Sequence, residues 1–210
     1  MISFEEKMRS GGDLAIQEAA RFFMKTDPVH QALQNIARNL EGLGIPYAVV
    51  GGMALVAHGY NRTTVDVNVL VTSKGLEAAH KELEGRGYLP AFPGSRGLRD
   101  TQTGVRIEFV VTGQYPGDGK PKPVAFPLPE ATSIEIGGVR YVRLNTLIEL
   151  KLASGMTHPG RLRDLADVQE LIRTLGLRSE FAEQLHPYVR EKFHELWCAV
   201  RQYPTGHDHP

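Results

Sequence analysis

Asp66 and Asn68 are the residues of this chain whose types and spacing point most directly to chemistry. They lie in the segment 65–71, VDVNVLV, where β-branched residues alternate with other side chains, a pattern typical of a strand. Side chains two apart on a strand share a face, so Asp66 and Asn68 point the same way and the valines point into the core. A carboxylate beside a second oxygen donor suits Mg²⁺, or Mn²⁺ in its place, held against phosphate oxygens.

A pair of glycines precedes this strand. Gly51 and Gly52 end the apolar run 47–50, YAVV, which is typical of a buried strand, and the alanine-rich run 53–58 predicts a short helix. Glycines at such a turn let the backbone approach a ligand closely and direct free N–H groups outward, a common way to hold phosphate. The glycine spacing of a P-loop or of a dinucleotide-binding fold is not present in this segment.

Glu108 is a second candidate carboxylate, on a second alternating segment. Residues 105–111, VRIEFVV, predict a strand with Arg106 and Glu108 on one face. If this strand lies beside that of Asp66, the two carboxylates and Asn68 converge on one spot. The competing interpretation makes Glu108 an exposed residue paired with Arg106 or another neighbour.

These residues together resemble the signature of the nucleotidyltransferase fold of the polymerase-beta-like superfamily. The matching positions are Gly51, Gly52, Ala54, His58, Gly59, Arg62, Thr64, Asp66 and Asn68. More narrowly, the chain is similar to small nucleotidyltransferases of the resistance type and of abortive-infection or toxin systems. In that superfamily a glycine turn opens a helix, an acidic pair on the next strand binds metal ions, and a later strand adds a third carboxylate. The chain departs from the pattern at Asn68, which keeps one neutral oxygen but lacks the charge.

The resemblance implies transfer of a nucleoside monophosphate from a nucleoside triphosphate (NTP) to a hydroxyl acceptor, with Mg²⁺ or Mn²⁺ as the cofactor. It implies that Asp66 and Glu108 are catalytic and that Asp66, Asn68 and Glu108 hold the metal. The nucleotide-binding residues that it implies are Gly51, Gly52, Arg62, Thr64, Lys151, Arg161 and Asp164. Those after residue 150 lie in LIELKLA and RLRDLADV, which match segments of the family and bring in Asp167 as a further candidate. The alternative for this later group is an ordinary surface ion-pair network.

Asn68 leaves three interpretations open. It is a substitution in an active enzyme, or the natural protein works with a reduced metal set, or the chain binds a nucleotide or a partner without turnover. The last interpretation describes a regulatory module, for example of a toxin–antitoxin or defence system with an antitoxin-type protein partner. The acceptor is equally open, because RNA ends, protein hydroxyls and small molecules are all used by similar proteins.

The composition limits the class of protein. The 210 residues are 41% hydrophobic and 23% charged, as in a soluble globular protein. The 24 basic and 24 acidic residues balance, which argues against a broad nucleic-acid surface but not against a local basic groove. Cys198 is the single cysteine and fits a reducing compartment. No apolar run reaches the length of a membrane span and the N-terminus lacks a signal-peptide segment, so we expect a cytoplasmic protein without a membrane partner.

The fold class predicted from these segments is α+β, with a short mixed β-sheet flanked by helices and followed by a C-terminal helical region. The predicted organisation is a helical lead at 1–27, a nucleotidyltransferase-like core at 28–144, a helical region at 145–203 and a disordered tail at 204–210.

Several helix limits are predicted from capping residues. Asp27 is expected to cap a helix that begins at Pro28, and Asn145 is expected to cap a helix that Gly155 ends. In the helical lead, one apolar face is expected to dock on the body or on a partner; its residues are Leu14, Ile16, Ala19, Ala20, Phe22 and Phe23.

Overall fold

A computed structural model describes residues 4–10 and 12–203, and the chain divides into two compact units. Unit 1 comprises residues 1–57, 61–112 and 127–142, and unit 2 comprises residues 58–60, 113–126 and 143–210, each within the described limits. The predicted tail at 204–210 lies outside the described residues. The predicted boundaries at residues 27 and 144 stay predictions.

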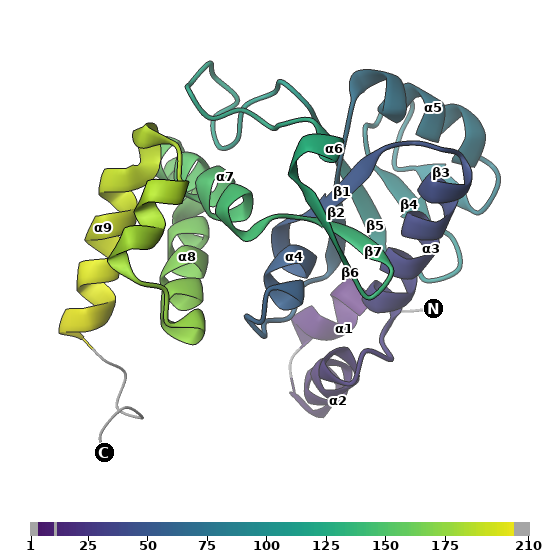
Figure 1. The fold of residues 1–210 in the computed structure, drawn as a ribbon. Coiled ribbons are helices and arrows are strands. Elements are labelled where there is room, and N and C mark those ends of the chain that lie inside the picture. Colours follow the sequence, from purple (N-terminus) through teal and green to yellow (C-terminus); the bar gives the residue numbers. More distant parts are fainter. Residues whose placement is uncertain (1–3, 11, 204–210) are drawn as a thin grey trace. The chain divides into compact units, whose positions relative to one another are not determined.

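Unit 1 is built on a mixed sheet whose described strands follow the order β3-β4-β5-β2-β1-β7-β6 (Figure 1). The strands are β1 Tyr47–Val50, β2 Asp66–Val71, β3 Tyr88–Pro90, β4 Leu98–Asp100, β5 Arg106–Val111, β6 Ser133–Ile136 and β7 Val139–Val142. β2 runs parallel to β5 and β1 runs parallel to β7, whereas the other neighbours are antiparallel. The predicted α+β fold with a mixed sheet is confirmed.

The alternation of β2 and β5 gives the sheet one buried and one more polar face in its centre. Val67, Val69 and Ile107 are fully buried, and Phe109 contacts the ring of His80 on α5 (Ser73–Leu83). The helix α3 (Pro28–Gly42) also packs on β2. As predicted, α3 begins at its proline, with the Asp27 carboxylate accepting hydrogen bonds from the first turn.

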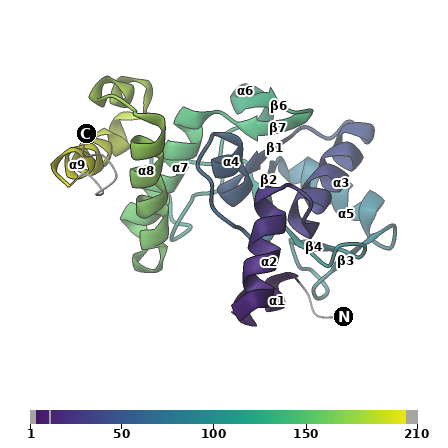
Figure 2. The same ribbon diagram turned by 90° about the horizontal axis from the view of Figure 1, so that it is seen from below.

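The first two helices differ from expectation in the face that they bury. α1 (Phe4–Ser10) and α2 (Gly12–Phe23) pack against one another in Figure 2, and a 3.0 Å ion pair links Lys7 to Glu18. Phe22 is buried, but Leu14, Ile16 and Phe23 are 41%, 68% and 54% exposed. Docking on the body is therefore wrong for these three residues, because the helix buries Phe22 against His30 and Glu18 beside Lys7 of α1 instead. Docking of this face on a partner stays a prediction.

Two short helices and a hairpin complete unit 1. The helix α4 (Gly51–Ala57) follows β1 directly, and α6 (Pro129–Thr132) precedes β6. β6 and β7 form an antiparallel hairpin whose turn, Gly137-Gly138, has φ values of 59° and 77°. Both values lie in the left-handed region that glycine adopts without steric cost.

Among its described residues, the regular structure of unit 2 is helical, and the segment 113–126 is a loop. Unit 2 contains α7 Leu144–Thr157, the 3₁₀ turn η1 Pro159–Arg161, α8 Leu162–Leu175, the 3₁₀ turn η2 Ser179–Gln184 and α9 Pro187–Gln202. The predicted limits of α7 are wrong, because the cap position is Arg143 and the helix continues through Gly155. A Cβ at Gly155 would lie 2.5 Å from Leu165 Cγ, so this glycine allows α8 to approach α7 rather than ending the helix. No helix among the described residues combines the length and apolar character of a membrane span.

Candidate active site

The register between β2 and β5 brings the predicted acidic residues together. The strands are parallel, with Asp66 opposite Arg106 and Asn68 opposite Glu108. Paired residues of neighbouring strands lie on the same face, so all four side chains project from one side of the sheet. The intervening residues of both strands are buried on the other side. The two carboxylates that the sequence places on separate strands therefore share one surface.

The guanidinium of Arg106 contacts both carboxylates. Its Nε lies 3.2 Å from Glu108 Oε1, and its Nη2 lies 3.9 Å from Asp66 Oδ2. The side chains of Arg106 and Glu108 are 44% and 43% exposed, and that of Asp66 is 20% exposed. Ion pairs with this much access to water contribute about 0–1 kcal/mol. The two carboxylates thus attract positive charge, but they hold the arginine side chain only weakly.

The diglycine turn lies directly against this polar face. Gly51 opens α4 with a φ of 66°, and a Cβ there would lie 3.1 Å from Asn68 Nδ2. A Cβ at Gly52 would lie 2.6 Å from Thr64 Oγ1, which is closer than side chains can approach. Both glycines are needed for the close approach of the turn to β2 and to the segment before it.

Thr64 fixes one oxygen of the Asp66 carboxylate. Thr64 is buried, and its Oγ1 donates a 2.9 Å hydrogen bond to Asp66 Oδ1. The other oxygen, Oδ2, is the one near Arg106. Arg62 lies in the segment between α4 and β2 and is partly buried. The resemblance implies nucleotide binding by both Arg62 and Thr64, which stays a prediction, and the structure shows Thr64 donating a hydrogen bond to a carboxylate.

The donor atoms on this face suit a hard cation. Asp66, Glu108 and Asn68 offer carboxylate and amide oxygens, the ligands that Mg²⁺ and Mn²⁺ prefer. A positive group, the Arg106 guanidinium, already contacts two of these side chains. In the described part of the chain, no group of three His, Cys, Asp or Glu residues is arranged to hold a metal ion. On this face, two carboxylates and one amide are the side chains that could hold a metal.

The later group of predicted residues belongs to unit 2. Lys151 of α7 is buried, and its Nζ lies 2.9 Å from Asp164 Oδ1 and 2.7 Å from Asp167 Oδ2 of α8. Ser154 Oγ donates a 2.7 Å hydrogen bond to Asp164 Oδ2. Burial by itself would raise the pKa of the Asp164 carboxyl, but Lys151, Ser154 and nearby Arg161 together hold that pKa below its usual range. The network joins two helices, with Lys151 and Asp167 buried and Asp164 partly buried, so it is less exposed than an ordinary surface ion-pair network.

Two contacts of these sites escape sequence reasoning. The sequence suggests Arg106 as a partner of Glu108, but it gives no reason to expect Arg106 near Asp66. The available signal is the spacing of two between Arg106 and Glu108, which places both on one face once the register is known. Ser154, which binds Asp164, carries no comparable signal, because a serine within a helix has no fixed partner.

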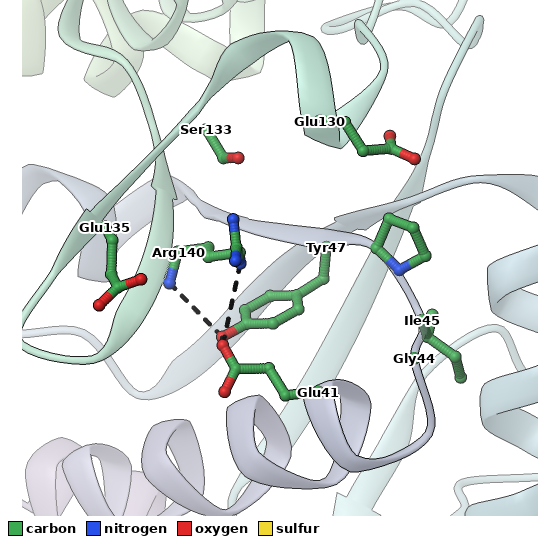
Figure 3. A pocket seen from close by; sticks show the side chains of 9 residues that line it. Glu41, Gly44, Ile45, Tyr47, Glu130, Ser133, Glu135 and Arg140 are labelled. Atoms are coloured by element: carbon green, nitrogen blue, oxygen red, sulfur yellow. Dashed lines mark hydrogen bonds and ion pairs between the residues drawn. The ribbon is translucent and has the colours of Figure 1, made fainter.

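A pocket of about 560 Å³ lies at the start of β1, at the opposite end of this strand from the diglycine turn (Figure 3). The Tyr47 hydroxyl donates to Glu41 Oε1 at 3.1 Å and accepts from the Arg140 backbone N–H at 3.4 Å, and burial raises the pKa of Tyr47 to about 12. Three glutamates and one arginine make the lining negative, which disfavours a triphosphate. The pocket residues are Glu41, Gly44, Ile45, Pro46, Tyr47, Glu130, Ser133, Glu135 and Arg140.

The chain matches no protein-family profile and no curated protein sequence, but its fold matches solved structures. ANT(2'')-Ia in complex with adenylyl-2''-tobramycin aligns over 82% of this chain and 96% of its own, with a TM-score of 0.50 and 14% identity. An antigenic nucleotidyltransferase-like protein from Paracoccidioides brasiliensis aligns over 83% of this chain and 88% of its own, with a TM-score of 0.48 and 15% identity. At these identities the likeness concerns architecture alone. The chain has the nucleotidyltransferase fold.

Proposed function

We propose that this protein transfers a nucleoside monophosphate from an NTP to a hydroxyl acceptor, with Mg²⁺ or Mn²⁺ bound at Asp66 and Glu108. The observation that carries the proposal is the meeting of these carboxylates on one face of the sheet, beside the diglycine turn. Phosphoryl-group transfer depends on positioning and on neutralising negative charge more than on covalent catalysis. Oxygen ligands next to a turn that a phosphate can approach closely meet both needs.

In this proposal each residue of the polar face has a defined part. When bound, a divalent ion neutralises the charge that develops on the attacking and leaving oxygens. Asp66 is the principal ligand, oriented by the hydrogen bond from Thr64, and Asn68 adds its amide oxygen. Glu108, which is more exposed, completes the set or accepts the proton of the acceptor hydroxyl. The diglycine turn holds the terminal phosphates near backbone N–H groups.

The proposed nucleotide contacts outside this face fall into two kinds. Arg62, two residues before Thr64 in unit 1, supplies positive charge for phosphate, and the nucleotide contact of Arg161, which is exposed in unit 2, stays a prediction. Lys151 and Asp164 bind each other, so we assign them an indirect part, in which they fix α7 and α8. This division separates side chains that would touch the substrate from side chains that hold the fold.

Asn68 favours a second candidate function, the binding of a nucleotide without turnover. With an asparagine at this position, the metal ligands carry one negative charge fewer than a set with an acidic residue there, and an amide cannot replace that charge. Arg106 adds a positive charge to the same face. A protein of this kind would act as a regulatory module, with an antitoxin-type protein as its proposed partner.

The acceptor is proposed only as a hydroxyl group. The ANT(2'')-Ia complex contains an adenylylated small molecule, which makes small-molecule hydroxyls one class to test. RNA ends and protein hydroxyls are the others. Balanced basic and acidic counts, 24 each, disfavour a long nucleic acid and leave a local contact with an RNA end open.

Label transfer from NTPs radiolabelled at the α-phosphate tests the proposal, with Mg²⁺ and with RNA, cell-protein and aminoglycoside acceptors. The proteins are the unaltered chain, Asp66→Asn, Asn68→Asp and, as a matched control, Asp13→Asn on the exposed part of α2. We expect Asp66→Asn to lower transfer about a thousandfold or more, because it removes several kcal/mol of charge stabilisation. Asn68→Asp should raise transfer, and the control should match the unaltered chain.

The outcomes separate the two functions. Transfer by the Asn68→Asp variant alone supports an impaired enzyme. Thermal stabilisation by an NTP without transfer in either form supports the nucleotide-binding module. If neither form binds any NTP, both candidate functions are wrong.

A further inference from the structure

The cation that contacts Asp66 and Glu108 belongs to the protein itself. Arg106 pairs with Asp66 across the parallel strands, so the base of its side chain is fixed beside that carboxylate. Its guanidinium approaches Glu108 Oε1 and Asp66 Oδ2, while Thr64 holds the remaining oxygen of Asp66. Arg106 therefore faces the same oxygens that a metal ion on this face would take.

Charge explains why a guanidinium is favoured at this place. Asp66 and Glu108 bring two negative charges onto adjacent strands, and like charges in such positions repel unless a cation lies near both. Asn68, directly opposite Glu108 and two residues after Asp66 on β2, adds no charge of its own. A divalent ion entering this face would meet a positive group and oxygens that are already engaged.

The Arg106 side chain can nevertheless move away from the two carboxylates. It is 44% exposed, and its longer contact is 3.9 Å, beyond hydrogen-bond distance. Exposed ion pairs of this kind are weak and are screened by salt. A guanidinium also pairs well with phosphate oxygens, so a triphosphate at the diglycine turn would offer Arg106 another partner.

We propose that Arg106 is a built-in competitor of the metal ion. Its guanidinium occupies the cation position beside Asp66 and Glu108 in the absence of nucleotide. When a triphosphate binds, the guanidinium pairs with phosphate oxygens instead, and the divalent ion takes the vacated position. The inference rests on the proposed function, because it assumes that these carboxylates bind metal. It follows that metal alone binds weakly and that metal and nucleotide strengthen each other's binding.

Titration with Mn²⁺, followed by electron paramagnetic resonance without nucleotide, measures the competition. Arg106→Gln removes the charge, Arg106→Lys keeps it, and Arg86→Gln is a matched control in an exposed ion pair with Glu82. We expect Arg106→Gln to bind Mn²⁺ roughly three- to fivefold more tightly than the unaltered protein, and the other two variants to stay within about twofold. A non-hydrolysable NTP analogue should raise the Mn²⁺ affinity of the unaltered protein more than that of Arg106→Gln.

The Asp66→Asn variant in the same assay separates this proposal from the proposed function. If Asp66→Asn loses Mn²⁺ while Arg106→Gln binds it no more tightly than the unaltered protein, the metal site stands and the competition is overturned. If Asp66→Asn binds Mn²⁺ as tightly as the unaltered protein, the metal site is wrong and the competition is wrong with it.

A second measurement uses the unaltered chain and does not depend on any variant folding. In ¹⁵N-labelled protein, the Nε–Hε resonance of Arg106 reports its contact with Glu108. We expect this resonance to shift when Mg²⁺ and the NTP analogue are added together. If the backbone amides of Asp66 and Glu108 shift while the Arg106 resonance stays unchanged, the guanidinium is not displaced and the proposal is overturned.

Discussion

Arg106 on the sheet of unit 1 and Lys151 on α7 of unit 2 each contact two carboxylates, and the two cations differ in burial and in distance. The Arg106 contacts measure 3.2 and 3.9 Å, and its side chain is 44% exposed. The Lys151 contacts measure 2.9 and 2.7 Å, and its side chain is 9% exposed. Both clusters consist of one positive and two negative side chains, so composition cannot be the source of the difference.

Solvent access separates the two clusters. Water screens the exposed pair, so its members exchange partners at little cost. The buried cluster has lost that screening, and each charge depends on the others because an unpaired buried charge is strongly unfavourable. We infer that the Arg106 cluster is suited to exchanging ligands, whereas the Lys151 cluster holds α7 against α8.

The largest expected effect on stability is that of Lys151→Met. The substitution leaves the buried Asp167 and the partly buried Asp164 without their cation, and we expect a loss of about 3–5 kcal/mol in the free energy of unfolding. Urea denaturation followed by fluorescence of Trp197, the single tryptophan, reports on unit 2 because this residue lies in α9. Lys74→Met, at an exposed position on α5, is the control. A loss below about 1 kcal/mol would show that the buried cluster is not structural.

Gly155→Ala is expected to cost about 2 kcal/mol, because the added methyl group overlaps Leu165 and pushes α8 away from α7. The control is Gly42→Ala at the end of α3, where an added Cβ meets no atom within 4 Å and φ is not positive. Thermal unfolding of both variants measures the difference. Equal melting temperatures would mean that the two helices of unit 2 adjust without loss.

Asp164→Asn tests the same cluster through pH. Because the pKa of the folded-state carboxyl is held below its usual range, ionised Asp164 stabilises the fold above its unfolded pKa of about 4, and this contribution is lost as pH falls through the lower folded value. We expect the variant to be less stable by about 1–2 kcal/mol at pH 7 and the difference to shrink below about pH 4. Urea denaturation at pH 7, 5 and 3 measures it. A difference that grows toward pH 3 would contradict the assignment.

The smallest expected effect is that of Arg106→Gln on stability. An exposed pair contributes little, so we expect a change below about 1 kcal/mol in the free energy of unfolding. Guanidinium chloride is unsuitable here because it screens ion pairs, so urea denaturation followed by circular dichroism is the measurement. A loss above about 2 kcal/mol would make Arg106 a structural residue and would remove the contrast with Lys151.

Local patterns predicted much of the fold, and the errors have identifiable causes. The strand at Tyr47–Val50 and the cap at Asp27 follow from hydrophobic runs and capping chemistry, which depend on neighbouring residues. The three-residue strand β4 is too short to show a period and lies in a segment that the sequence does not mark as a strand. Gly155 looks like a helix end in sequence, but its role depends on a leucine of another helix.

The sequence by itself determined that Asp66 and Asn68 share a face and that a diglycine turn precedes them, because strand periodicity and glycine conformations are properties of a few adjacent residues. Only the tertiary structure decided that Glu108 lies beside Asn68, that Arg106 reaches Asp66, and that Lys151 is buried. Register and burial arise when distant segments pack against one another. The sequence pattern within one strand or helix therefore does not show which residues of another segment it will contact.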